Sequence, residues 1–316
     1  MRPWSALTLT GLLALAGAGC ELTEVDVAEA EPVVVVEGLV RLSDRPGGDR
    51  DEVVVYLHRS LGPGGVAQGV PGARVEVVRE GDGARWRLEE QDASTCLVSA
   101  PVDAVGTCYG LPEDRFTALE PGDALSLEVD TPDGTSLLGR ATVPPAFTLR
   151  NAPTWRECWI PAGEPFELVW SRSEGAWSYI TEATLVGLRD ALEPRGIPVE
   201  EEPLELLGVA LSADDTTSVV PGDLGVFERA DLDRQLALVL QEGMPPGTRA
   251  VLALQAADRN TVNWLRGGNF NPSGQIRVPS IAGDGGTGFF GAVYLVDLQI
   301  FVEPAIPEDT PPCGAP

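Results

Sequence analysis

Hydrolytic chemistry that depends on histidine has little support in this chain. The single histidine among its 316 residues is His58, which lies between Leu57 and Arg59 in a segment that we expect to be a β-strand. A Ser-His-Asp triad would have to recruit this imidazole, and the sequence contains no Gly-x-Ser-x-Gly motif to supply the nucleophile. We therefore interpret His58 as a structural or surface histidine and predict that the protein is not an enzyme.

Carboxylates are abundant but form no recognisable catalytic or metal-binding motif. Adjacent acids such as Asp214 and Asp215 do not identify a glycosidase pair among 48 acidic residues. Calcium prefers oxygen ligands, and the loops 49–52 and 130–134 both cluster carboxylates, yet neither has the EF-hand spacing. We expect ordinary solvated turns there. The glycine cluster 283–288 lacks the Lys-Ser/Thr ending of a phosphate-binding loop, so a backbone turn is expected there too.

One cysteine ends a short apolar segment at the start of the chain. Arg2 precedes the apolar run 6–16, and the small residues 17–19 lead to Cys20, a pattern typical of an export signal rather than a membrane span. The segment resembles the lipobox of bacterial lipoproteins, in which the cysteine is lipid-modified and becomes the new amino terminus. Gly17 stands where such boxes usually carry leucine. The alternative is an ordinary secreted protein that is cleaved nearby and keeps Cys20 as a free or disulfide-bonded thiol.

The other four cysteines form an even set, and an exported protein meets an oxidising compartment, so we expect two disulfides. Three pairings are possible on paper. We favour Cys96 with Cys108, which would close a short loop, and Cys158 with Cys313 near the end of the chain. A four-cysteine zinc site lacks any C-x-x-C spacing, and a single histidine excludes the usual multi-histidine zinc site. We expect no metal and no cofactor apart from the covalent lipid at Cys20.

The charge is strongly negative. The 22 basic residues are all arginine, and against 48 acids they leave a formal net charge of −26. Nucleic-acid binding depends on basic contacts to phosphate, so this balance argues against such a partner and against adsorption of the folded body to anionic lipid. The acidity favours solubility and self-repulsion outside the cell.

Glycine and proline, 36 and 27 residues, punctuate the chain well above their usual combined share of about 12%. Short runs of β-branched and alternating residues lie between these turns, with almost no helical period. The sequence predicts an all-β protein with two β-sandwich domains of immunoglobulin-like size and at most one or two short helices. We place a signal peptide at 1–19, an acidic tether at 20–32, an N-terminal sandwich at 33–146, a C-terminal β-rich domain at 147–304 and a Pro-rich tail at 305–316.

Within the second domain, several elements can be predicted individually. The runs 236–240 and 250–255 are predicted strands on either side of the turn 245–247. The segment 258–265 is predicted to be a short helix capped by Asp258. The long apolar run 289–302 is predicted to be a closing strand pair or one bent strand.

Aromatic residues gather near the start of the second domain, at Trp155, Trp159, Trp170, Trp177 and Tyr179. Most should form the core of the sandwich. The alternative is a functional role, in which exposed aromatic side chains form a sugar-stacking or partner-binding patch. Trp155 and Trp159 are then the candidate ligand contacts.

The order of several segments resembles a family of bacterial lipoproteins, those of domain of unknown function 4249. The matching pieces are Cys20-Glu21 and the runs VVVVEGLV, VPGARVEVV, LEPGDALSLEVDTPDG, ATVPPAF and FNPSGQIRVPSIAGDGGTGFFGAVYLV. The resemblance covers nearly the whole mature chain, and the segment between Cys96 and Cys108 departs from it. It implies an exported lipoprotein with no established chemistry, often encoded beside a TonB-dependent outer-membrane receptor.

We therefore expect a non-enzymatic outer-membrane lipoprotein, held in the membrane by acyl chains such as palmitate at Cys20. Glu21 after the cysteine is, by the resemblance, compatible with the outer membrane. The expected role is that of a binding or accessory module for a TonB-dependent receptor. The alternative is a structural or adhesive lipoprotein of the cell envelope without a transport partner.

Overall fold

The computed structural model describes residues 32–44, 51–60, 68–96, 105–112, 119–154, 156–225, 234–267 and 278–314. Contacts divide the chain into two units, residues 1–31 and 32–316, and every element described below belongs to the second. The predicted signal peptide, Cys20 and nearly all of the tether lie outside the described residues.

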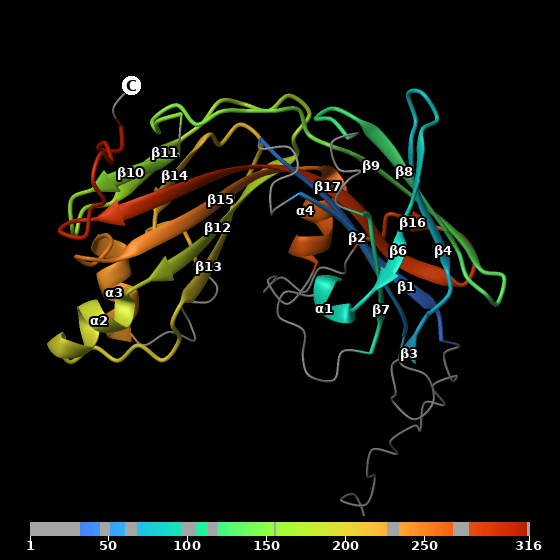
Figure 1. Ribbon diagram of the computed structural model, residues 1–316, viewed down its shortest axis with the longest axis horizontal. Coiled ribbons are helices and arrows are strands. Elements are labelled where there is room, and N and C mark those ends of the chain that lie inside the picture. Colours follow the sequence, from blue (N-terminus) through green and yellow to red (C-terminus); the bar gives the residue numbers. More distant parts are fainter. Residues whose placement is uncertain are drawn as a thin grey trace, which may run out of the picture. The chain divides into compact units, whose positions relative to one another are not determined.

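The described chain is mostly β-sheet, as predicted (Figure 1). Its strands are β1 (Val34–Ser43), β2 (Glu52–Arg59), β3 (Gln68–Gly69), β4 (Arg74–Arg79), β5 (Arg85–Arg87), β6 (Glu89–Gln91), β7 (Thr107–Gly110), β8 (Ala124–Asp130), β9 (Ser136–Thr142), β10 (Glu157–Ile160), β11 (Phe166–Val169), β12 (Ser178–Val186), β13 (Leu204–Val209), β14 (Thr217–Val220), β15 (Arg249–Ala257), β16 (Ile281–Ala282) and β17 (Gly286–Val302).

Helices are short but more numerous than predicted. The described residues contain α1 (Ala93–Cys96), α2 (Leu188–Leu192), α3 (Arg234–Glu242) and α4 (Arg259–Arg266), with a 3-10 turn η2 (Glu193–Arg195) after α2. The helix predicted at 258–265 is confirmed as α4, and the Asp258 carboxylate accepts a hydrogen bond from the Thr261 N–H (2.8 Å), as expected of an N-cap.

The strand predicted at 236–240 is wrong, because this segment forms part of α3. Leu236, Leu238 and Leu240 would share one face of a strand, and this period of two suggested a strand. In the structure Leu236 and Leu240 are buried on one face of the helix, whereas Leu238 is 52% exposed. Five residues fit both periods, so only packing against the rest of the protein separates the two.

The long strand β17 is the centre of a ten-stranded sheet in the order β13-β12-β15-β17-β1-β2-β7-β6, with β10 also beside β17 and β3 beside β2. It pairs antiparallel with β15 on one side, from Val293 to Phe301. On the other side its first ten residues pair in parallel with β1, and residues 299–302 pair in parallel with β10. The predicted apolar closing run is therefore one continuous strand, buried without a break from Phe290 to Val296.

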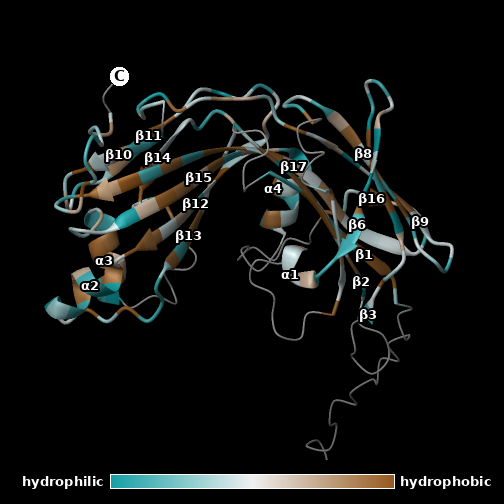
Figure 2. Cartoon of the chain, viewed as in Figure 1, coloured by the Kyte–Doolittle hydropathy of each residue, from teal (hydrophilic) through white to brown (hydrophobic). Residues whose placement is uncertain are grey.

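Because β17 pairs with β1 near the start of the chain, the predicted boundary between residues 146 and 147 does not separate the sheets. Strands from both sides of that boundary share the ten-stranded sheet. Hydrophobic segments run along its central strands β12, β15 and β17 (Figure 2). The predicted boundary depends on the sequence pattern near residues 146 and 147. Strand pairing instead joins β1 and β17, which lie near opposite ends of the described chain.

A second sheet, in the order β16-β9-β8-β4-β5, consists of four strands from the N-terminal half and the short strand β16 from near the end of the chain. Its inward side chains, such as Val77 and Leu127, are fully buried in the same core as Phe290 of β17. Gly139 of β9 leaves space for that phenylalanine, since a Cβ there would lie 2.7 Å from the Phe290 Cβ. The turn predicted over the glycine cluster 283–288 is confirmed only for residues 283–285, which join β16 to β17 with Gly283 and Gly285 at positive φ, whereas residues 286–288 begin β17.

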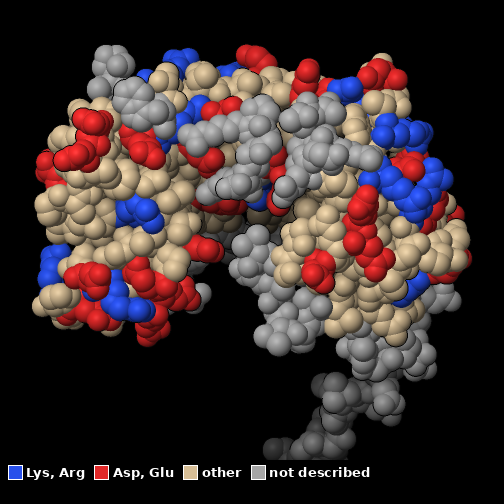
Figure 3. Space-filling model, viewed as in Figure 1, with Lys and Arg blue, Asp and Glu red and all other residues tan. Residues whose placement is uncertain are grey.

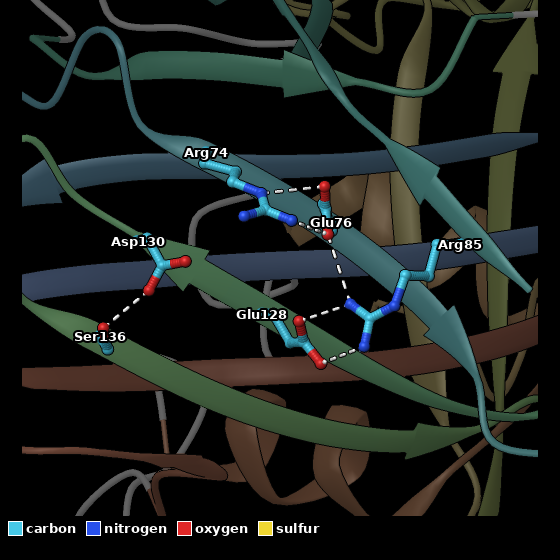
Figure 4. Close-up of polar contacts among 6 residues, drawn as sticks. All are labelled: Arg74, Glu76, Arg85, Glu128, Asp130 and Ser136. Atoms are coloured by element: carbon cyan, nitrogen blue, oxygen red, sulfur yellow. Dashed lines mark hydrogen bonds and ion pairs between the residues drawn. The ribbon is translucent and has the colours of Figure 1, made fainter. Parts of the chain in front are cut away.

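The outer face of this second sheet carries a network of charges (Figure 4). Glu76 on β4 and Glu128 on β8 are directly opposite each other in the strand register. Arg85 on β5 bridges them, with its Nη1 2.7 Å from Glu128 Oε2 and 3.3 Å from Glu76 Oε2. Arg74 adds two hydrogen bonds to Glu76, of 3.0 and 2.9 Å. The arginines thus lie beside the two glutamates and offset the repulsion between their like charges.

Both predicted disulfides are confirmed. Cys96 at the end of α1 is bonded to Cys108 on β7, and Cys158 on β10 is bonded to Cys313 in the tail. The tail lies along β10, because the Cys313 N–H donates to the Trp159 carbonyl (2.8 Å) and the Trp159 N–H donates to the Pro311 carbonyl (2.9 Å). The Pro-rich end of the chain is therefore fixed by a covalent bond and by backbone pairing.

Candidate ligand-binding pocket

A pocket of about 420 Å³ lies between the end of the sheet-edge strand β13 and the strand β14. β13 pairs with β12 on one side, and β14 pairs with β11 in a separate two-stranded sheet. The lining residues come from four places in the sequence that the fold brings together: Trp170, Tyr179, Thr181, Gly208, Val209, Ala210, Leu211, Asp215, Thr217, Ser218, Gly222 and Asp223.

The wall formed by residues 208–211 is held in place by hydrogen bonds to its backbone. The Ala210 carbonyl accepts from the Ser178 hydroxyl (2.7 Å) and from Arg266 Nη2 (3.2 Å). The same Arg266 nitrogen donates to the Leu211 carbonyl (3.1 Å), and the Ala210 N–H donates to the Tyr179 carbonyl (2.9 Å). Leu211 is nevertheless 88% exposed at the rim. The fold therefore holds an apolar side chain in solvent beside a cavity.

The floor is formed by residues whose side chains are almost fully buried. Trp170 and Tyr179 pack edge to face with ring centroids 5.2 Å apart. Burial raises the pKa of Tyr179, an effect partly opposed by the Ser173 N–H, which donates to the Tyr179 hydroxyl (2.7 Å). Thr181, two residues along β12 on the same face, is 4% exposed. The floor is therefore rigid and mostly apolar, with three polar atoms in it.

Two of these polar atoms have no hydrogen-bond partner among the described residues. The Trp170 indole N–H lies close enough to the Tyr179 hydroxyl to lower its pKa as a donor, yet the contact does not have the geometry of a normal hydrogen bond. The Thr181 hydroxyl makes none to another described residue either. Buried polar groups are almost always paired with protein or water. Trp170 and Thr181 both line the cavity, so these two polar groups lie next to its contents.

The opposite wall carries two carboxylates that are fixed by backbone N–H groups. Asp215 Oδ2 accepts from the Ser212 N–H (3.0 Å), and Asp223 Oδ2 accepts from the Val219 N–H (2.7 Å). The hydroxyls of Thr217 and Ser218 lie in the same lining. These groups give the mouth of the pocket a row of oxygen atoms whose positions are set by the turns around β14.

The electrostatic character of the pocket is acidic. Its lining contains two aspartates and no arginine or histidine. The neighbouring Asp214 is paired with Arg172 outside the lining (2.6 Å). Acidic side chains also outnumber basic ones over the visible face of the described residues (Figure 3). An anionic ligand would meet repulsion both locally and from the whole molecule.

The aromatic residues singled out in the sequence have different positions. Trp170 and Tyr179 are core residues, as expected for most of the group, and they also form the floor of the pocket. Trp159 is half-buried on β10, outside the lining of this pocket, and Trp155 lies outside the described residues. Trp177 is 48% exposed, with the guanidinium of Arg259 5.3 Å above its ring. The proposed contact role of Trp155 and Trp159 stays a prediction.

His58 lies on β2, where its ring packs at 5.6 Å from that of Tyr56 and its Nδ1 lies 3.3 Å from the Arg59 carbonyl. In the loop after β8, the Asp133 carboxylate bonds to Thr131 and Arg59, and these contacts hold its pKa well below its usual value. In the described part of the chain, no group of three or more His, Cys, Asp or Glu side chains could hold a metal ion.

The sequence pattern alone does not bring the pocket residues together. Asp214 and Asp215 stand out as paired acids, and Trp170 and Tyr179 belong to the aromatic group, but no local signal marks Thr181 or Asp223. These residues meet only because β12, β13 and β14 converge.

No family model matches the chain, and a search of curated proteins returned no match. Among the described residues, no helix is both long and apolar enough to cross a membrane.

Proposed function

We propose that the protein is an exported, lipid-anchored and non-enzymatic binding protein of the bacterial outer membrane, which holds a small ligand in the pocket between β13 and β14. The observation that carries the binding role is the preformed cavity, whose floor contains the buried Trp170 indole N–H without a hydrogen bond of normal geometry. Ligand sites are typically preformed cavities of about 300–1,000 Å³ with a few convergent polar groups.

Export is supported by two independent features. The first is the signal-like segment that ends at Cys20, and the second is the pair of disulfides, which persist in oxidising compartments such as the periplasm. In this proposal Cys20 carries the acyl chains. Each buried methylene stabilises membrane binding by about 0.8 kcal/mol, so several chains hold the protein firmly.

The proposed partner is a TonB-dependent outer-membrane receptor. This part of the proposal rests on the resemblance to the lipoproteins of domain of unknown function 4249, as does membership of that family. We also propose that each half of the described unit is an immunoglobulin-like sandwich, with β17 shared between them. In support, buried residues of the five-stranded sheet and of the N-terminal strands of the larger sheet belong to one hydrophobic core, which continues into the C-terminal half.

Metabolic labelling with a palmitate analogue tests the anchor. Cells that produce the full-length chain should yield labelled protein in the outer-membrane fraction, and Cys20→Ser should abolish both label and membrane retention. Unlabelled wild-type protein in the soluble fraction would overturn the anchored function.

Crosslinking in native membranes, followed by affinity purification, tests the partner. A β-barrel receptor recovered with the wild-type chain supports the accessory role. Recovery of the protein alone under several growth conditions would contradict it and favour a structural or adhesive envelope role.

A further inference from the structure

The pocket floor requires a ligand that has both hydrogen-bond acceptors and donors. The Trp170 indole N–H can only donate, so it needs an acceptor atom. The Thr181 hydroxyl both donates and accepts. Both side chains are more than nine-tenths buried and line the cavity. A purely apolar ligand would leave these groups unpaired, which is costly in a buried site.

The mouth of the pocket offers oxygen atoms to a ligand from the solvent-exposed residues Asp215, Thr217 and Asp223. Each of Asp215 and Asp223 uses its Oδ2 for a backbone N–H, and in the described residues neither Oδ1 accepts a hydrogen bond. The hydroxyls of Thr217 and Ser218 stand beside them without a partner among the described residues. Two fixed carboxylate oxygens at one mouth suit a ligand that presents several O–H or N–H groups.

The charge and volume of the pocket restrict the chemical class of its ligand further. Two aspartates in the lining disfavour carboxylates, phosphates and sulfates, because the two nearby guanidinium groups are already engaged, that of Arg266 with the Ala210 and Leu211 carbonyls and that of Arg172 with Asp214. Hydroxyl groups both donate and accept hydrogen bonds. A polyol can therefore accept from the Trp170 N–H in the floor and donate to the carboxylates at the mouth. A cavity of about 420 Å³ has room for a ligand the size of a sugar ring. We propose that this pocket binds a single saccharide unit, either neutral or carrying an amino group, and rejects acidic sugars.

This inference rests on the proposed binding function and names its ligand class. Isothermal titration and ligand-observed NMR on the purified full chain would use glucose, galactose and mannose as neutral sugars, glucosamine as the amino sugar and glucuronate as the acidic sugar. At least one neutral or amino sugar should bind at millimolar concentration or below, and glucuronate should not. Equal or tighter binding of glucuronate, or no binding by any neutral or amino sugar, would overturn the proposal.

Three substitutions test whether the sugar binds in this pocket. Asp215→Asn and Asp223→Asn keep the shape but weaken the charged acceptors, and each should weaken sugar binding roughly tenfold. Thr181→Val removes a buried hydroxyl with little change of volume and should weaken binding without lowering the melting temperature. The matched control is Asp214→Asn, which removes the neighbouring carboxylate outside the lining and should leave binding unchanged.

Sugar binding that is insensitive to Asp215→Asn, Asp223→Asn and Thr181→Val would place the ligand elsewhere and overturn the assignment. The same holds if Asp214→Asn weakens binding as much as Asp215→Asn. The outcome is separable from the envelope function: a chain labelled at Cys20 that binds no sugar loses the ligand class and keeps the anchor. An unlabelled chain that binds sugar in this pocket loses the anchor and keeps the ligand class.

Discussion

At the scale of single residues, Asp258 combines two opposing effects. It caps α4 through the Thr261 N–H, but it is 7% exposed, and desolvation raises its pKa despite the hydrogen bonds that lower it. The folded protein therefore holds this proton more tightly than the unfolded chain. The resulting stability is fully present below the unfolded value of 3.8 and is lost as the pH rises through the folded pKa.

Asp258→Asn tests this balance, because asparagine keeps an acceptor for the cap and does not titrate. Its melting temperature relative to wild type should increase as the pH rises from about 3 to about 7. Asp258→Ala, the control, loses the cap and should be about 1 kcal/mol less stable than Asp258→Asn in urea unfolding at every pH. A difference between Asp258→Asn and wild type that does not change with pH would show that Asp258 titrates alike in both states.

At the scale of elements, the strands β4, β5 and β8 place two glutamates opposite each other and supply arginines to separate them. The pKa of Glu76 is lowered, first by its hydrogen bonds from Arg74 and then by contacts with Arg85. Its contribution to stability is therefore present above the ordinary value of 4.5 and is lost as the pH falls through the lowered folded pKa. The contacts are near the surface, so we expect a small effect that weakens with salt.

Arg74→Gln should raise the pKa of Glu76 more than Arg85→Gln does, measured by NMR titration of the glutamate carboxyl carbon. Arg87→Gln is the matched control: it lies opposite Glu76 in the register but makes none of the contacts that lower this pKa. A shift from Arg87→Gln as large as that from Arg74→Gln would show a general loss of positive charge rather than specific hydrogen bonds.

At the scale of the whole molecule, the two disulfides constrain very different lengths of chain. Cys158 and Cys313 are 155 residues apart in sequence, and Cys96 and Cys108 are 12 apart. A crosslink that closes a longer loop removes more entropy from the unfolded chain.

Replacing Cys158 and Cys313 together with alanine should therefore lower the free energy of unfolding by about 5 kcal/mol, against about 3 kcal/mol for Cys96 and Cys108. Each pair contains one half-cystine whose residue is fully buried, Cys158 or Cys108, so the two double variants are matched. Urea unfolding of both compares them directly. An equal loss, or a larger loss for the short loop, would show that native contacts rather than loop closure dominate the effect.

Much of the local structure could be predicted from sequence because it depends on neighbouring residues. The β-branched run from Val33 to Leu42 predicts β1, and Asp258, an available N-cap, predicts α4. Five residues at 236–240 satisfied both strand and helix periods, so α3 was missed. The pairing of Cys96 with Cys108 and of Cys158 with Cys313 was preferred among three arrangements and is confirmed.

The amino-acid sequence by itself determined that this is an acidic, strand-rich chain with one histidine and an even set of four further cysteines, because composition and short-range periodicity carry those properties. Tertiary structure alone decided that β17 joins β1 to β15, and that Trp170, Thr181, Asp215 and Asp223 meet in one pocket. The physical reason is that strand partners are selected by burial of whole faces between segments far apart in the chain. No local pattern records which faces will meet.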